Sequence, residues 1–219
     1  MSDRGIVPQE KRPRGRPKDA GKRAALLDAA RTLFLKNGPD VSLDEIAAAA
    51  HVAKATLYAN FSDKDTLIEE VVRRESDLTI TDAQYQAIRR EPVEQALRTF
   101  GRNFLAFVNS KELFSWDSLF AYIAMRDSGV PKRFFDLGPG RGQRLLEELI
   151  SAAVARGELA AENPCQAADA LTGLWLGFTN LEIKLGMRAQ LSAVELTDRV
   201  DRGIQIFMLV YGAEEGRRR

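Results

Sequence analysis

The stretch SLDEIAAAAHVAKATLYANF runs from Ser42 to Phe61 and carries the clearest structural signal in the chain. It opens on a capping box, in which the side chains of Ser42 and Glu45 each satisfy a backbone N–H that a helix start leaves unpaired. Apolar residues then recur at the i, i+3, i+4 and i+7 positions of a helix. A break at 51–53 and a second short helix over 54–61 follow. The pattern therefore predicts two short helices joined by a tight turn.

That layout is typical of a helix-turn-helix, whose second helix enters the DNA major groove. The spacing alone is weak evidence, because many helical proteins contain short helix pairs. Three further features agree with it: a preceding basic arm, apolar residues that can pack the two helices together, and exposed hydrogen-bond donors suited to phosphates and bases. The packing residues are Ile46, Ala47, Val52 and Leu57. The exposed residues are Lys54, Thr56, Tyr58 and Asn60.

Positive charge is concentrated at the amino terminus. Residues 1–23 hold eight Lys and Arg against three Asp and Glu, although the whole chain has a net charge of only +1. The densest part is KRPRGRPK, Lys11 to Lys18. This segregation indicates an arm with a polyanionic partner.

The composition excludes several other classes. With 219 residues, 45% of them hydrophobic and 29% charged, the chain is long enough for a core and is not disordered. A single cysteine, Cys165, excludes an internal disulfide framework. No apolar stretch is long enough for a signal peptide or a membrane span, so we expect a cytoplasmic protein without a membrane partner.

The sequence contains few residues that could form a catalytic site. One histidine and one cysteine, in different regions, cannot form a metal cluster, so we expect no metal and no cofactor. The run from Gly138 to Gly142, GPGRG, lacks the Gly-Lys-Ser/Thr ending of a phosphate-binding loop and is better explained as a loop before a helix. We therefore expect the chain not to be an enzyme.

Helical periodicity dominates, and no segment sustains a period of two. We expect an all-α fold of about nine helices, with boundaries near 22–37, 43–50, 54–61, 62–89, 93–107, 112–125, 142–156, 164–185 and 193–211. The expected domains are a basic arm over 1–21, a DNA-binding domain over 22–68, and a ligand-binding and dimerisation domain over 69–219.

The run from Lys22 to Val72 resembles the DNA-binding domain of the TetR family of bacterial transcriptional regulators. The residues that carry the resemblance are Ala29, Ala30, Leu33, Phe34, Gly38, Ser42, Ile46, Ala47, Ala50, Val52, Thr56, Leu57, Tyr58, Phe61, Lys64 and Leu67. Between Pro131 and Gly186, RFFDLGPGR and ARGELAAENPCQAADALTGL resemble the carboxy-terminal domains of AefR-like members. The resemblance implies an all-helical homodimer that usually represses transcription and releases DNA when it binds a small molecule.

The resemblance also assigns residues. It puts Lys54, Thr56, Tyr58 and Asn60 on the recognition helix. It makes Lys64 a phosphate contact, and it places the Ser42 hydroxyl and its helix start against another phosphate. The chain departs from the family pattern at His51, Ala53, Ala55 and Asn60, where Gly, Ser, Gly and His are usual.

The arm contains PRGRP, Pro13 to Pro17, which resembles the AT-hook core. The prolines favour an extended backbone, and Gly15 allows close approach to the groove floor. Arg14 and Arg16 can then lie along the minor groove of A·T-rich DNA. The alternative is a solvated basic tail that adds only non-specific phosphate affinity.

Two further surfaces belong to the body. Seven of the eleven phenylalanines lie between Phe100 and Phe135 and suit an aromatic or apolar effector, although they could equally form core. The candidate effector residues are Phe100, Phe104, Phe107, Trp116, Phe120 and Tyr122. The last two helices carry wide apolar faces that suit a dimer interface, unless they are buried within the subunit. The candidate interface residues are Leu174, Trp175, Phe178, Ile204, Phe207 and Tyr211.

The favoured hypothesis is a repressor that binds a palindromic operator in double-stranded DNA as a homodimer and is released by a small apolar or aromatic effector. One alternative is an architectural binder of A/T-rich DNA without a discrete operator. The other is a helical enzyme or carrier that uses the aromatic cavity, against which the missing catalytic set counts.

Overall fold

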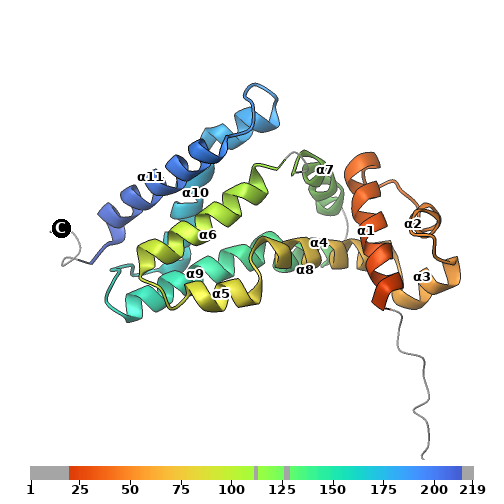
Figure 1. The fold of residues 1–219 in the computed structure, drawn as a ribbon, viewed down its shortest axis with the longest axis horizontal. Helices are drawn as coiled ribbons and strands as arrows, with labels where there is room; N and C mark the ends of the chain where they lie inside the picture. Colours follow the sequence, from red (N-terminus) through yellow and green to blue (C-terminus); the bar gives the residue numbers. More distant parts are fainter. Residues whose placement is uncertain (1–19, 111–112, 126–128, 214–219) are drawn as a thin grey trace, which may run out of the picture.

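The computed structural model describes residues 20–110, 113–125 and 129–213, and within them the chain forms eleven α-helices and no strand. The prediction of an all-α fold is confirmed. Helices α1 to α3 lie at one end of an elongated molecule, and α10 and α11 lie toward the opposite end (Figure 1). The arm residues Arg14 and Arg16 lie outside the described residues.

The first three helices, α1 (Ala20–Asn37), α2 (Leu43–Ala49) and α3 (Lys54–Asn60), form a small unit around one core. Leu26, Ala30 and Phe34 of α1 are almost completely buried, as expected of one helix face. Gly38 ends α1 with a φ of +75°, a conformation that glycine adopts without steric cost. The Ser42 capping box then starts α2, as predicted.

The helix expected to run from 62 to 89 is two helices, and that prediction is wrong. Asp63 caps α4 (Lys64–Thr79) by accepting a hydrogen bond from the Thr66 N–H. Ile80 then takes an extended conformation, and α5 (Asp82–Ile88) begins at a second capping box, formed by Thr81 and Gln84. That box is visible in the sequence as a Thr-x-x-Gln spacing.

The middle of the chain also differs from expectation. After α6 (Val93–Val108) and α7 (Leu113–Ala124) comes α8 (Val130–Leu137), which was not predicted. Gly129, with a φ of +85°, precedes it, and Pro131 lies in its first turn, where a missing N–H is tolerated. The next helix, α9 (Pro139–Ala155), begins earlier than expected, so most of GPGRG forms its first turn rather than a loop.

The last two helices are α10 (Pro164–Lys184) and α11 (Ala193–Tyr211). Asn163 caps α10 by accepting a hydrogen bond from the Gln166 N–H, and Ser192 forms a capping box with Glu195 at the start of α11. At Gly177 the backbone leaves helical geometry, with φ +47° and ψ −164°, so α10 is two helical segments joined at a break.

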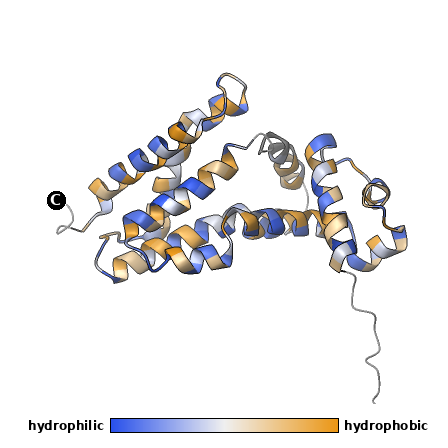
Figure 2. Cartoon of the chain, in the orientation of Figure 1, coloured by the Kyte–Doolittle hydropathy of each residue, from blue (hydrophilic) through white to orange (hydrophobic). Residues whose placement is uncertain are grey.

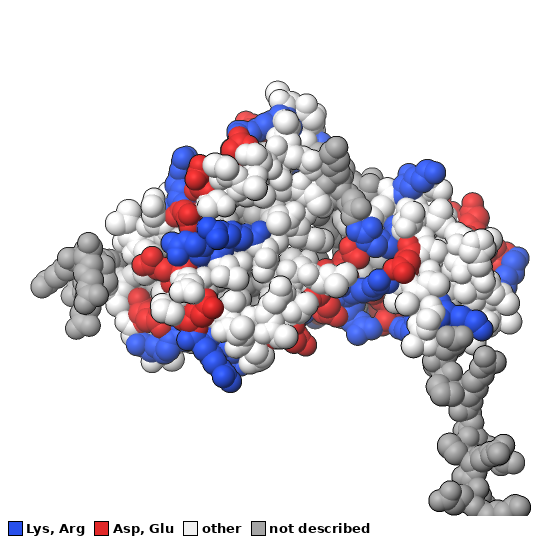
Figure 3. Space-filling view, in the orientation of Figure 1, with Lys and Arg blue, Asp and Glu red and all other residues white. Residues whose placement is uncertain are grey.

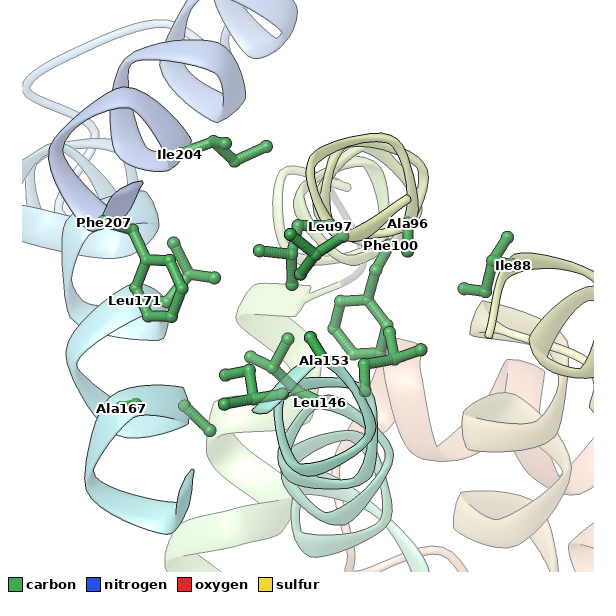
Figure 4. Packing of buried hydrophobic residues seen from close by; sticks show 14 of the residues in the cluster. Ile88, Ala96, Leu97, Phe100, Leu146, Ala153, Ala167, Leu171, Ile204 and Phe207 are labelled. Carbon is green, nitrogen blue, oxygen red and sulfur yellow. The ribbon is translucent and has the colours of Figure 1, made fainter. Parts of the chain in front are cut away.

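Hydrophobic and hydrophilic residues alternate along the helices, as expected where each helix buries one face (Figure 2). The buried faces form two cores. One combines α1 to α4 with residues of α7 and α8. The other joins α5, α6, α9, α10 and α11, where Phe100, Leu146, Leu171 and Phe207 converge (Figure 4).

Candidate nucleic-acid interface and effector cavity

The helix-turn-helix forms as predicted. Ile46, Ala47 and Leu57 are almost completely buried between the helices, and Val52 packs against them. His51 has a φ of 54°, and among the described residues it is the single non-glycine residue with positive φ. Ala53 starts α3 without a side-chain cap. The turn therefore lacks two stabilising features at the positions where the sequence departs from the family pattern.

The four recognition-helix residues differ in how available they are. Tyr58 is 53% exposed, and Lys54 is exposed but forms a 2.5 Å ion pair with Asp44 of α2. The hydrogen bond that Lys54 donates to the Asp44 carboxylate raises the pKa of Lys54, so this amine is charged at neutral pH. The Asn60 amide donates to the carbonyl of Thr56 at 2.8 Å. Each of these side chains keeps further hydrogen-bonding capacity beyond this one bond, so both can still contact DNA.

Ser42 and Lys64 lie at helix starts, as expected, and each already has partners. The Ser42 N–H and hydroxyl both donate to the Glu45 carboxylate at 2.7 Å, which lowers the pKa of Glu45. Lys64 lies with its amine 5.9 Å from the centroid of the Tyr122 ring on α7. The carboxylate of Glu45 occupies the anion-binding position at the start of α2, so a phosphate there must compete with it.

The helix-turn-helix domain itself has no excess of positive charge. Residues 22–68 contain six Lys and Arg and six Asp and Glu. Figure 3 shows both signs at the end of the molecule formed by α1 to α3. The chain's excess positive charge therefore lies in the arm that precedes this domain, and it is the arm that can add phosphate attraction of long range.

A cavity of about 260 Å³ lies between the two cores. Its wall combines α4, α6, α7, α9 and α10, with Val72, Leu145 and Leu176 among its apolar residues. Five of the six predicted effector residues line it: Phe100, Phe104, Phe107, Trp116 and Phe120. Tyr122 does not, which corrects that prediction. Positions two apart on a helix point to different sides, so Tyr122 cannot share the face of Phe120.

The polar side of the cavity was not predicted from the sequence. Glu75 and Thr79 of α4, Arg141 of α9, and Asn180 and Lys184 of α10 all line it. Thr79 lies four residues after Glu75, and Lys184 four after Asn180. Helical spacing could therefore have grouped each pair. Nothing in the sequence shows that α4, α9 and α10 meet.

The predicted dimer residues divide into two groups, and three of them are not at the surface. Trp175 is fully buried, and Ile204 and Phe207 are at most 2% exposed. Trp175 fits there because Gly101 and Gly203 leave room for it, since a Cβ at either would lie within 2.8 Å of the indole ring. The prediction that Trp175, Ile204 and Phe207 form a surface is wrong.

An apolar surface remains on the outer side of the same two helices. Phe178 is 82% exposed, whereas Leu174 and Tyr211 are only partly exposed and pack against the core. The other large exposed apolar residues of this surface, which we call the outer apolar face, are Leu181, Leu185, Ile206, Leu209 and Val210. Single exposed apolar residues are common, but a group on two neighbouring helices indicates an interaction site.

Residues 95–213, more than half of the chain, match the carboxy-terminal domain of AefR-like transcriptional repressors, and residues 26–71 match the tetR family of bacterial regulatory proteins. The chain belongs to the TetR family.

Individual relatives agree with this assignment. A TetR-family regulator from Mesorhizobium loti MAFF303099 is 25% identical, with a TM-score of 0.77 over 91% of this chain and 100% of that one. The flavonoid-responsive regulator FrrA is 27% identical, with a TM-score of 0.68 over 89% of this chain and 99% of that one. The HTH-type transcriptional regulator YdeS of Bacillus subtilis (strain 168) is 48% identical over 56 residues, which span 28% of its length.

This TetR-family chain is therefore a DNA-binding transcriptional regulator. The prediction that it is not an enzyme is confirmed by this membership, because its relatives are DNA-binding regulators. Across residues 20–110, 113–125 and 129–213, no cluster of His, Cys, Asp and Glu could hold a metal ion. No helix in those ranges is long and apolar enough to cross a bilayer.

Proposed function

We propose that this protein is a homodimeric repressor that binds a palindromic operator and is released by a small apolar or aromatic effector. Residues 22–68 contact the operator, and residues 69–219 contain the effector cavity and the dimer surface. Arg14 and Arg16 of the arm enter the flanking minor groove, while Lys54, Thr56, Tyr58 and Asn60 read the major groove and Ser42 and Lys64 contact phosphates.

The observation that carries this proposal is the position of α4. Its first residue, Lys64, follows the recognition helix closely, whereas Val72, Glu75 and Thr79 farther along line the cavity. One rigid element thus borders both sites. An effector that binds one position of α4 more tightly than another will shift the population of dimers, and with it the affinity for DNA.

The outer apolar face supports the dimer. In a two-fold assembly of TetR-family subunits, Phe178 and Leu209 of one copy would meet the same face of the other. Two recognition helices must then lie about 34–36 Å apart, which demands a near-palindromic site.

Selection of bound sites from random duplex DNA, at fixed near-physiological salt, tests this function. We expect a two-fold symmetric motif with half-sites about one helical turn apart and an A/T preference on its flanks. Enrichment of A·T content without a palindrome would instead support the architectural alternative. No enrichment would contradict both.

A further inference from the structure

The effector cavity has flat, apolar walls. Five aromatic side chains from α6 and α7 line it, and the Phe100 and Phe104 rings are stacked, with centroids 6.5 Å apart and planes 25° apart. At about 260 Å³ the cavity lies just below the usual range of about 300–1,000 Å³ for sites of drug-sized ligands. These walls fit a small molecule with aromatic rings.

The two charged side chains on the α4 and α9 sides are neutralised within the protein. Glu75 forms a 2.8 Å ion pair with Arg31, which approaches from α1. Arg141 donates to the carbonyls of Ser76 at 3.2 Å and Ile80 at 3.1 Å.

Arg141 also pairs with Asp77 at 3.3 Å and Asp82 at 3.0 Å. Its guanidinium therefore holds the corner between α4 and α5, and four of its five N–H groups face these partners. Lys184, at the end of α10, likewise has a partner of its own. An anionic ligand would have to share each of these cations with an existing partner, and an unpaired charge in an apolar cavity is strongly disfavoured.

The hydroxyl groups on this wall already donate hydrogen bonds within the protein. The Thr79 hydroxyl donates to the Glu75 carbonyl at 3.0 Å, and the Ser76 hydroxyl donates to the Gly138 carbonyl at 3.3 Å.

Asn180 is different. It is partly exposed, it lines the cavity, and within the described part of the chain its side-chain amide makes no hydrogen bond. An amide offers both a donor and an acceptor, so it can bind a neutral hydroxyl or carbonyl group.

We propose that Asn180 selects the effector, and that the effector is an uncharged aromatic molecule with a hydroxyl or carbonyl group that hydrogen-bonds to this amide. This inference rests on the proposed function, because it takes the cavity to be the effector site. It specifies the chemistry: aromatic rings against the walls, one polar group at Asn180, and no carboxylate.

Three matched compounds test the ligand class: biphenyl, 4-phenylphenol and biphenyl-4-carboxylate. They share two rings and differ only in a missing, neutral or anionic polar group at pH 7. Because Trp116 lines the cavity, tryptophan fluorescence can report binding. We expect the purified full-length protein to bind 4-phenylphenol about five- to ten-fold more tightly than biphenyl, the effect of one buried hydrogen bond. The carboxylate should bind more weakly than both.

Asn180→Leu keeps the side-chain size and removes the amide. We expect it to remove the five- to ten-fold advantage of 4-phenylphenol and to leave biphenyl affinity within about two-fold. Gln166→Leu is the matched control, because this exposed residue also loses an amide on α10 but lies outside the cavity. Thermal unfolding of each variant checks that the fold is retained.

Several outcomes would overturn the assignment of Asn180: equal loss for all three compounds, tighter binding of the carboxylate, or no binding of 4-phenylphenol. Release of a selected operator by 4-phenylphenol is measured separately. Binding that depends on Asn180 without release from DNA would keep the ligand class and contradict the repressor function. Release of the operator by other apolar compounds, with no effect of Asn180→Leu, would support the repressor function and contradict the proposed ligand class.

Discussion

At the residue scale, two residues in the turn of the helix-turn-helix lower its stability. His51 occupies the left-handed region at φ 54°, and Ala53 leaves the start of α3 uncapped. Both features follow from residue type. Glycine adopts a positive φ without steric cost, and a serine hydroxyl at the start of α3 would supply the missing cap. These positions could be identified from the sequence because helix caps and positive-φ turns are local.

Ala53→Ser should stabilise the DNA-binding domain. A serine at this position can accept a hydrogen bond from an unpaired N–H of α3, which is worth about 0.5–2 kcal/mol in comparable caps. Chemical denaturation measures the free energy of unfolding. Ala55→Ser is the control, since the same residue inside α3 supplies no cap and should leave stability unchanged or slightly reduced. Equal effects of the two substitutions would contradict the capping argument.

At the element scale, the break in α10 depends on two residues. Gly177 adopts φ +47°, and Arg199 of α11 donates to the carbonyls of Trp175 and Leu176, the latter at 2.6 Å, and to the Thr179 hydroxyl at 3.0 Å. Burial lowers the pKa of this guanidinium, although arginine remains charged at any pH of interest. The segment after the break carries Leu181 outward and Asn180 toward the cavity. The break therefore sets the position of both surfaces.

Gly177→Ala should destabilise the protein by about 1–3 kcal/mol, the cost of forcing a side chain into a sparsely populated backbone region. Its Cβ would also lie 2.6 Å from an Arg199 guanidinium nitrogen. Gly142→Ala is a matched control, because Gly142 lies inside α9 and a Cβ there meets no atom within 4 Å. That substitution should raise the free energy of unfolding by up to about 1 kcal/mol. Thermal or denaturant unfolding distinguishes the two, and an unchanged Gly177→Ala midpoint would show that the break is not needed.

At the scale of the whole molecule, the DNA-binding end and the outer apolar face lie far apart (Figure 1). DNA binding and the proposed dimerisation can therefore be tested by separate substitutions. Positive charge is also unevenly distributed. Residues 22–68 contain equal numbers of positive and negative side chains, and the excess of positive charge lies in residues 1–21.

Phe178→Asp should give a monomer. The side chain is 82% exposed, so the substitution disturbs little within the subunit but places a charge in the proposed interface. Light scattering measures the mass in solution, and operator affinity should fall because one half-site is lost. Leu78→Asp is the control: Leu78 is 63% exposed on α4, outside the outer apolar face, and its variant should remain a dimer. A dimeric Phe178→Asp protein would exclude this face as the interface.

Removing residues 1–18 should weaken operator binding and flatten its salt dependence. If Arg14 and Arg16 of each subunit contact phosphates, the slope of log K against log salt should become shallower by about 3 to 4 units, at roughly 0.9 for each lost contact. Replacing both arginines by lysine keeps the charge but not the planar guanidinium. That variant should keep most of the slope and lose the A/T preference. An unchanged slope in the truncated protein would rule out phosphate contacts by the arm.

From the sequence alone we could predict the all-helical class, the helix-turn-helix with its Ser42 capping box, and the charged arm. These features depend on residues within a few turns of one another, such as Ser42 with Glu45 or Ile46 with Leu57. Which apolar residues face inward depends instead on long-range packing. Periodicity shows that Trp175 and Phe178 are apolar, but packing against Gly101 and Gly203 buries the first and leaves the second exposed. The polar side of the cavity also required the structure, because α4, α9 and α10 are distant in sequence and meet only through long-range packing.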